Sequence, residues 1–301
     1  MNATRVTTAR AELSTGSVTS ADGTTIGYRQ VGRGPAVVVL HGSNESAASH
    51  LQLAQALASK FTVYLPDRRG RGRSGPHRPG HGLRTEVEDL SAVAARAGAE
   101  LVFGVSTGAL IALSAARAGS GIRRVAAYEP ALLLGDAGRY TGWLDRFDRE
   151  LAAGKVAAGL ITSLHGLDLA PPAFKLLPRP LAEALTSAAM KAEDGKAGPD
   201  AVTMRQLAPT VRYEGLLLAE TAGTIADFAD VTAEVLLLGG DMKRPGFIRP
   251  AFDALGQTLP RSRRAVFAGL DHGGSSDPGP SNRAGQPAVV APEIRSFFAQ
   301  G

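Results

Sequence analysis

The chain has 301 residues, of which 44% are hydrophobic and 5% aromatic, so it is long enough to bury the aliphatic core of one large domain. It has no cysteine, and this excludes disulfide bonds, a thiolate nucleophile and cysteine-bound metals. The formal net charge is +5, but many arginines cluster between residues 68 and 84 and form no basic stripe, so we expect no nucleic-acid partner.

The amino-terminal sequence gives no indication of export or membrane anchoring. Residues 1–8 lack the apolar core of a signal peptide. No segment of the chain is long and apolar enough to cross a bilayer. The sequence therefore predicts a soluble, cytoplasmic protein that binds no membrane.

Short strands alternate with helices in the first hundred residues. The run 36–40 is apolar at every position, which is typical of a central parallel strand covered on both faces. Apolar residues at helical spacing predict a helix at 51–57. The predicted elements before residue 104 are, in order, two strands within 11–30, a strand at 36–40, a helix at 51–57, a strand at 61–65, a helix at 83–97 and a strand at 100–103.

A serine lies where the last of these strands meets the next helix, in Gly104-Val105-Ser106-Thr107-Gly108. Holding a serine on so sharp a turn requires strained backbone angles, and a side chain at Gly104 or Gly108 would strike the neighbouring strand or helix. The turn exposes the Ser106 hydroxyl at the amino end of the helix, where the Thr107 N–H can stabilise an oxyanion. We therefore predict Ser106 as a nucleophile and Thr107 as an oxyanion donor.

The later part of the chain continues the alternation, with one long interruption. Strands are predicted at 124–130, 233–238 and 265–267, followed by a last helix at 291–299. Strands that alternate with helices imply a parallel sheet with right-handed crossovers, and such sheets bind ligands at their carboxyl edge. Residues 135–230 break this rhythm, because their pattern is helical and punctuated by prolines.

The interrupting segment predicts a second structural unit. We interpret residues 135–230 as a helical cap inserted after the sixth core strand, between two parts of the core at 1–134 and 231–301. The alternative is that these residues are further core helices with no role as a lid. Apolar cap residues favour a small apolar substrate, unless they only fill the core of the cap; they are Leu160, Ile161, Leu164, Leu176, Leu177 and Leu181.

Four stretches, in this order, together resemble the α/β-hydrolase superfamily. They are His41-Gly42 after a core strand, the arginine-rich loop 67–74 after the next strand, the serine turn 104–108, and Gly269-Leu270-Asp271-His272 near the end. The resemblance covers nearly the whole chain outside the cap and implies an α/β fold with a mostly parallel sheet flanked by helices. It also implies that the Ser43 N–H is the second oxyanion donor and that His272 is the general base.

Other polar residues in these stretches are expected to have structural roles. We expect the His41 side chain to cap the end of its strand, and the loop 67–74 to shape the surroundings of the serine turn, with Arg69 a candidate for the pocket edge. The remaining histidines are expected at the surface or the pocket rim; they are His50, His77, His81 and His165.

The acid that would orient His272 has two candidates. The superfamily usually places it a few residues past the strand 235–238, but alignment on Gly240 puts Lys243 there, and Asp241 comes two residues early. A minority of members, such as some haloalkane dehalogenases, place it at the end of the strand after the serine helix, where this chain has Glu129. We favour Glu129, and Asp241 remains the alternative.

The resemblance and these residues imply a serine hydrolase. A serine nucleophile argues against the branches that use aspartate, so we expect an ester, thioester, lactone or amide of a small apolar molecule to be cleaved through an acyl-enzyme at Ser106. No metal or organic cofactor is needed for this reaction. Alternatives on the same scaffold are hydrolysis of a C–C bond, cofactor-free perhydrolysis, or ligand binding without catalysis. A homodimer is also left open.

Overall fold

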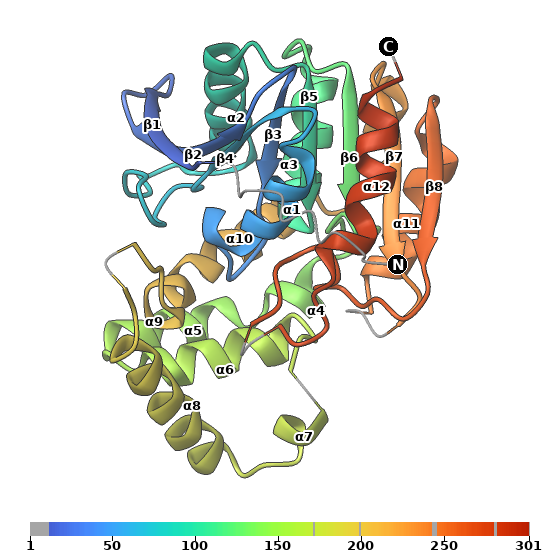
Figure 1. Cartoon of the computed structure of the whole chain (residues 1–301). Coiled ribbons are helices and arrows are strands. Elements are labelled where there is room, and N and C mark those ends of the chain that lie inside the picture. Colours follow the sequence, from blue (N-terminus) through green and yellow to red (C-terminus); the bar gives the residue numbers. More distant parts are fainter. Residues whose placement is uncertain (1–11, 171, 199, 243–245, 280–281, 301) are drawn as a thin grey trace, which may run out of the picture.

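The computed structural model describes residues 12–170, 172–198, 200–242, 246–279 and 282–300. The prediction for the leader at residues 1–8 therefore lies outside the described residues, as does Lys243. Figure 1 shows an eight-stranded sheet with helices on both faces, and a group of helices that extends from one edge of it. Within the described residues, no helix combines the length and apolarity that a membrane span requires.

The sheet has the mixed but mostly parallel arrangement that the alternation of elements predicts. Its strand order is β1-β2-β4-β3-β5-β6-β7-β8, with antiparallel pairing only among β1, β2 and β4. The strands are β1 (Ser14–Thr19), β2 (Thr25–Gly32), β3 (Ala36–Leu40), β4 (Thr62–Pro66), β5 (Leu101–Val105), β6 (Arg124–Tyr128), β7 (Glu234–Gly240) and β8 (Ser262–Phe267).

The strand order reverses direction between β3 and β5, because β4 lies on one side of β3 and β5 lies on the other. Connections on the two sides of such a point leave the sheet in opposite directions and open a crevice at the carboxyl ends of the strands. Ser106 follows β5 directly, and the loop that begins at His41 follows β3. The topology therefore places the candidate nucleophile and the candidate oxyanion loop side by side.

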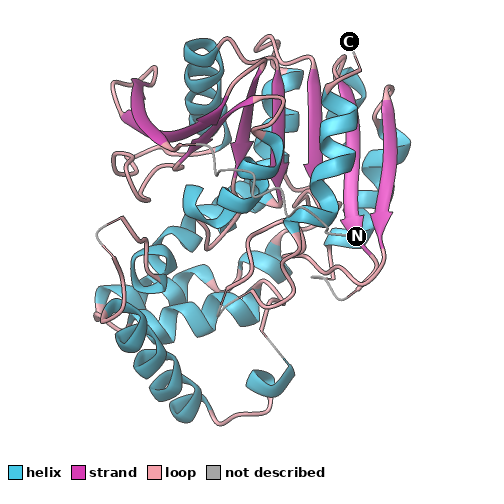
Figure 2. Cartoon of the chain, in the orientation of Figure 1, coloured by secondary structure: helices cyan, strands magenta, loops and turns pink. Residues whose placement is uncertain are grey.

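Helices cover both faces of the sheet (Figure 2). The helices that pack on it are α1 (Leu51–Leu57), α2 (Leu83–Ala97), α3 (Thr107–Arg117), α11 (Ile248–Thr258) and α12 (Pro287–Phe298). The predicted last helix is confirmed but begins four residues earlier, because Pro287 fits the first turn of a helix, where no backbone N–H is needed.

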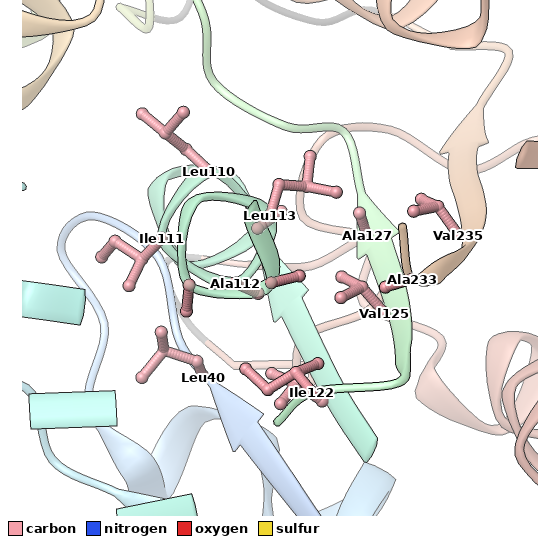
Figure 3. Packing of buried hydrophobic residues seen from close by; sticks show 14 of the residues in the cluster. Leu40, Leu110, Ile111, Ala112, Leu113, Ile122, Val125, Ala127, Ala233 and Val235 are labelled. Carbon is pink, nitrogen blue, oxygen red and sulfur yellow. The ribbon is translucent and has the colours of Figure 1, made fainter. Parts of the chain in front are cut away.

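Alternate residues of the central strands enter different cores, which explains why these strands are apolar throughout. Val38 and Leu40 join the core under α2, α3 and α11, while Val37 and Val39 join the core under α1 and α12. Figure 3 shows the first of these cores around α3. Its labelled residues are Leu40, Leu110, Ile111, Ala112, Leu113, Ile122, Val125, Ala127, Ala233 and Val235.

The chain between β6 and β7 is helical over the residues that the structure describes. Its α-helices are α4 (Gly138–Thr141), α5 (Leu144–Ala152), α6 (Val156–Gly166), α7 (Pro172–Lys175), α8 (Arg179–Asp194), α9 (Met204–Leu207) and α10 (Val211–Glu220). In Figure 1, α5, α6 and α8 lie beyond the carboxyl edge of the sheet, and α10 lies between them and the strands. Short 3-10 helices occur at Ala47–His50, Ala208–Thr210 and Ile225–Asp230.

The leucines that favoured an apolar substrate do not form one apolar surface. Leu160 is buried against Met190 and Ala208 within the helical segment itself. Leu176 and Leu181 are exposed, with 86% and 47% of their surface accessible. These positions belong to the segment's own core or to its outside, so they carry no information about the substrate.

Candidate active site

The serine turn has the strained geometry that its sequence predicts. Ser106 lies between β5 and α3 with φ 54° and ψ −120°, a region that residues with a side chain rarely adopt. A Cβ atom added to Gly104 would lie 2.5 Å from the Gly108 carbonyl oxygen, and one added to Gly108 would lie 2.4 Å from the Leu40 carbonyl oxygen. Both glycines are therefore required by close backbone approach.

Replacing Gly108 with alanine is expected to destabilise the protein by about 3 kcal/mol or more, because the new methyl group meets the backbone of β3, which cannot rotate away. Chemical denaturation measures this loss. The matched control is Gly135→Ala, since nothing lies within 4 Å of a Cβ atom at Gly135. Equal stability of the two variants would refute this explanation of the turn.

His272 lies within hydrogen-bonding reach of the serine. Its Nε2 atom is 3.1 Å from the Ser106 Oγ atom, and its side chain is 21% exposed. The loop that carries His272 is held by β6, because the hydroxyl of Tyr128, the last residue of that strand, donates a hydrogen bond of 2.7 Å to the Asp271 carbonyl oxygen. The Asp271 carboxylate accepts from the Gly273 N–H and so stabilises the same turn.

Glu129 contacts the other ring nitrogen of His272. Its Oε2 atom is 2.7 Å from His272 Nδ1, and its Oε1 atom accepts the Gly240 N–H at 3.0 Å. The Glu129 side chain is fully buried, and its backbone has φ 45°. Because a carboxylate only accepts, Nδ1 carries the proton and Nε2 is left to accept the Ser106 hydroxyl proton. The three side chains thus form a continuous line of hydrogen bonds.

Asp241, the alternative acid, is bound elsewhere. Its Oδ1 atom accepts the Gly269 N–H at 2.7 Å, which connects the loop after β7 to the loop after β8. Glu129 is instead placed by strand pairing: Val105 of β5 pairs with Tyr128 of β6, so the next residues, Ser106 and Glu129, emerge together. The structure therefore brings Glu129, and not Asp241, into contact with His272.

The two candidate oxyanion donors lie beside Ser106. Thr107 begins α3, where the first N–H groups have no partner within the helix. A Cβ atom on Gly42 would lie 3.1 Å from Ser106 Cβ, so the loop that contains Ser43 passes directly over the serine. In the described part of the chain, neither the Ser43 N–H nor the Thr107 N–H donates a hydrogen bond to the protein. Both are available to a bound oxygen.

His41 caps a strand end, as its position suggests. Its Nε2 atom accepts the Arg68 N–H at 3.0 Å, so its Nδ1 atom carries the proton and faces the Gly42 carbonyl oxygen. Burial lowers the pKa of His41 well below its usual value, and the neighbouring Arg71 and Arg68 cations lower it further. His41 is therefore a neutral structural residue.

A buried charge network below the serine turn was not predicted. Arg68 donates to both Glu86 oxygens at 3.0 and 2.8 Å, to Glu214 Oε1 at 3.0 Å and to Thr107 Oγ1 at 3.2 Å. Arg71 also bonds to Glu214. Burial alone would lower the pKa of Arg68, but the Glu214 and Glu86 carboxylates raise it. The network connects α2, α3 and α10, and Glu214 is its member from the helical segment.

Three other expectations for polar residues are wrong. Arg69 is not at the edge of a pocket: it is fully buried and bonds to Asp89 and Asp22, which lie on α2 and in the β1–β2 turn. His50 and His81 are not at the surface: His50 is fully buried beside Glu45, and the His81 side chain is 1% exposed beside Glu86. In each case the buried nitrogen-bearing side chain lies against a carboxylate.

Replacing Glu214 with alanine is expected to lower the free energy of unfolding by about 3–5 kcal/mol, because Arg71 is left as a buried cation without a carboxylate. The matched control is Asp148→Ala, which removes a pair with Arg212 whose side chains are 40% and 39% exposed. This change is expected to cost about 1 kcal/mol or less. Denaturant titration of both variants checks the difference, and similar losses would contradict it.

Metal-binding geometry is a separate question from the serine site. Across the described ranges, no group of three or more His, Asp or Glu side chains is arranged to hold a metal ion.

Known proteins share this architecture. A model of the "Alpha/beta hydrolase family" matches residues 37–284. An alpha/beta hydrolase from Sphaerobacter thermophilus is 29% identical, with a TM-score of 0.74 over 94% of this chain and 100% of that chain.

Two more distant structures share the fold alone. An esterase from a Rhodococcus species is 21% identical, with a TM-score of 0.64 over 95% of this chain and 99% of its own. A meta-cleavage product hydrolase from Pseudomonas fluorescens is 18% identical, with a TM-score of 0.60 over 94% of this chain and 97% of its own.

Proposed function

The chain belongs to the alpha/beta hydrolase family, and on that premise we propose that it is a serine hydrolase that cleaves a carboxylic ester, thioester, lactone or amide of a small molecule. The observation that carries this proposal is the line of contacts from Ser106 through the two nitrogens of His272 to Glu129, at 3.1 and 2.7 Å. Acyl transfer by a serine triad needs such a line of contacts, and this supports the proposal.

The reaction follows from these positions. The Ser106 oxygen attacks the substrate carbonyl while His272 Nε2 takes the hydroxyl proton, and the Nδ1 proton stays on the side of Glu129. The Thr107 and Ser43 N–H groups then hold the oxyanion, and each such donor lowers the barrier by on the order of 3 kcal/mol. His272 passes its proton to the leaving group. A water, deprotonated by His272, then attacks the acyl carbon; the bond to Ser106 Oγ breaks, His272 returns the proton to that oxygen, and the acid leaves.

We also propose that residues 135–230 act as a cap on two core parts, 1–134 and 231–301. The support is a chain of contacts: Glu214 of α10 bonds to Arg68, and Arg68 bonds to the Thr107 side chain next to the serine. A segment held so close to the nucleophile is placed to select the acyl group of the substrate. Leu160 lies in the cap's own core, and Leu176 and Leu181 are exposed, so the proposed substrate is not restricted to apolar molecules.

Two other reactions use the same constellation. The first is hydrolysis of a C–C bond in a diketone, which we consider because the fold is shared with a meta-cleavage product hydrolase. The second is perhydrolysis. A binding protein without catalysis would not require the aligned Ser106, His272 and Glu129. We favour ester hydrolysis over these two reactions, because cleavage of a carbonyl compound with a good leaving group needs only the proton transfers that this triad performs.

A panel of p-nitrophenyl esters of increasing acyl length, lactones and vinylogous diketones tests the proposal. We expect saturable hydrolysis of at least one short or medium ester, with a rate that is lost in Ser106→Ala. Turnover of diketones without any ester would replace the proposed reaction by C–C hydrolysis. No turnover of any member would contradict the proposed substrate classes.

A further inference from the structure

The oxyanion loop after β3 folds back on itself through a carboxylate. Asn44 has φ 54°, and this left-handed residue turns the chain so that the Glu45 side chain reaches back to the start of the loop. Glu45 Oε2 accepts the Gly42 N–H at 2.8 Å. The carboxylate is mostly enclosed, with 20% of its side chain exposed.

The same carboxylate also holds the loop that carries the general base. Glu45 Oε1 accepts from the hydroxyl of Ser276, which lies four residues after His272 and is buried. Glu45 Oε2 is also 3.2 Å from Nε2 of the fully buried His50. One side chain thus connects the oxyanion loop to the base loop, across 231 positions of the sequence.

The contact with Gly42 determines which N–H of the loop is left for a substrate. Gly42 donates to Glu45, whereas the next N–H, that of Ser43, has no acceptor among the described residues. A Cβ atom on Gly42 would lie 3.1 Å from Ser106 Cβ and 3.3 Å from Glu45 Oε2. Glu45 and Ser106 therefore lie against the same glycine, and the orientation of its peptide depends on the carboxylate.

Glu45 is ionised at neutral pH. Burial alone would raise the pKa of Glu45, but the His50 imidazole, the Ser276 hydroxyl and the Gly42 N–H lower it to about 2. A carboxylate next to a developing oxyanion would by itself oppose catalysis, since like charges repel. The three hydrogen-bond donors around the Glu45 carboxylate weaken the electric field of its negative charge at the oxyanion. Its effect on the orientation of the Gly42 peptide remains.

We propose that Glu45 is a positioning residue for the oxyanion hole: it turns the Gly42 N–H away, leaves the Ser43 N–H facing the substrate oxygen, and fixes this donor relative to His272. This inference rests on the proposed function. The effect of Glu45 is expected in the transition state, because only there does the substrate's carbonyl oxygen carry the full negative charge that the Ser43 N–H binds. Binding of the uncharged ester depends on it much less.

Three variants separate geometry from charge. Glu45→Ala removes every contact and is expected to lower kcat about 30- to 100-fold while KM changes less than about threefold. Glu45→Gln keeps an oxygen for the Gly42 N–H but has no charge, so it is expected to stay within about fivefold of the parent. Ser276→Ala removes only the link to the base loop and is expected to lower kcat about three- to tenfold.

The deciding readout is inhibition by a trifluoromethyl ketone analogue of the best ester, which forms a tetrahedral oxyanion on Ser106. Its inhibition constant is expected to rise across the variants by the same factors by which kcat/KM falls, while the Kd of the product acid stays constant. This parallel does not arise from a loss of folded protein, which lowers the active fraction and leaves inhibition constants unchanged.

The outcomes distinguish this inference from the proposed function. An active parent with an unchanged Glu45→Ala, or with a lower kcat but unchanged ketone inhibition, would overturn the positioning role and leave the serine hydrolase intact. A parent without esterase activity and without covalent reaction at Ser106 would overturn both. If Glu45→Ala does not fold, Ser276→Ala decides the question by the same two measurements, and an unchanged kcat with unchanged ketone inhibition in that variant would overturn the positioning role.

Discussion

Replacing Ser106 with alanine is expected to lower kcat for the best ester by roughly 10⁵- to 10⁶-fold, the loss seen when the nucleophile of a serine triad is removed. The Ser106 oxygen is the atom that forms the covalent bond, and the oxyanion donors and His272 cannot replace it. Steady-state kinetics of the parent and the variant measures this loss. The two proteins are prepared in parallel so that contaminating esterases are detected.

The fold of the Ser106→Ala variant is expected to be unchanged, since alanine and serine have the same Cβ atom and the same backbone strain at φ 54°. Ser114→Ala is the matched control. Ser114 lies on the same helix and donates only to the Leu110 carbonyl oxygen, so this variant is expected to retain parent activity. A Ser106→Ala enzyme with even a tenth of the parent rate would show that the reaction takes place elsewhere.

Replacing Glu129 with glutamine is expected to lower kcat by about two to four orders of magnitude, with the fold retained. The glutamine oxygen can still accept the Gly240 N–H, which directs its NH₂ group at His272 Nδ1. The imidazole must then accept at Nδ1 and carry its proton on Nε2, where it cannot take the Ser106 proton. The fall in kcat is therefore caused by the wrong tautomer of His272, and KM is expected to change little.

The control for Glu129→Gln is Asp241→Asn. The asparagine oxygen can still accept the Gly269 N–H, so this variant is expected to stay within about threefold of the parent rate. Kinetics of both variants on one ester compare the two carboxylates directly. A large loss in Asp241→Asn together with a small loss in Glu129→Gln would reverse the assignment of the acid.

The parts of the site that are predictable from sequence depend on local chain geometry. Gly104 and Gly108 flank the serine because the turn brings backbone atoms within reach of their Cβ positions, and this requirement is visible in five consecutive residues. Glu129 is a candidate because the family resemblance offers an acid position at the end of the strand after the serine helix, and the pairing of β5 with β6 explains why that position lies level with Ser106.

The parts that sequence reasoning missed depend on pairs that are distant along the chain. Arg68 and Glu214 are 146 residues apart, and a loop rich in arginine gives no indication that its cations are buried. The sequence gives no signal for Glu45, because the contacts with Gly42 and Ser276 exist only in the folded chain. Leucines in the cap were equally uninformative, since core and pocket residues have the same composition.

The central claim is that Ser106 is a nucleophile activated by His272. Intact-protein and peptide mass spectrometry after reaction with a fluorophosphonate tests it most directly, because this reagent reacts with an activated serine and leaves a stable adduct. We expect one adduct per chain on the peptide that contains Ser106, at a rate that falls strongly in His272→Ala. No adduct on that peptide, or labelling of Ser106 that is equally fast in His272→Ala, would contradict it.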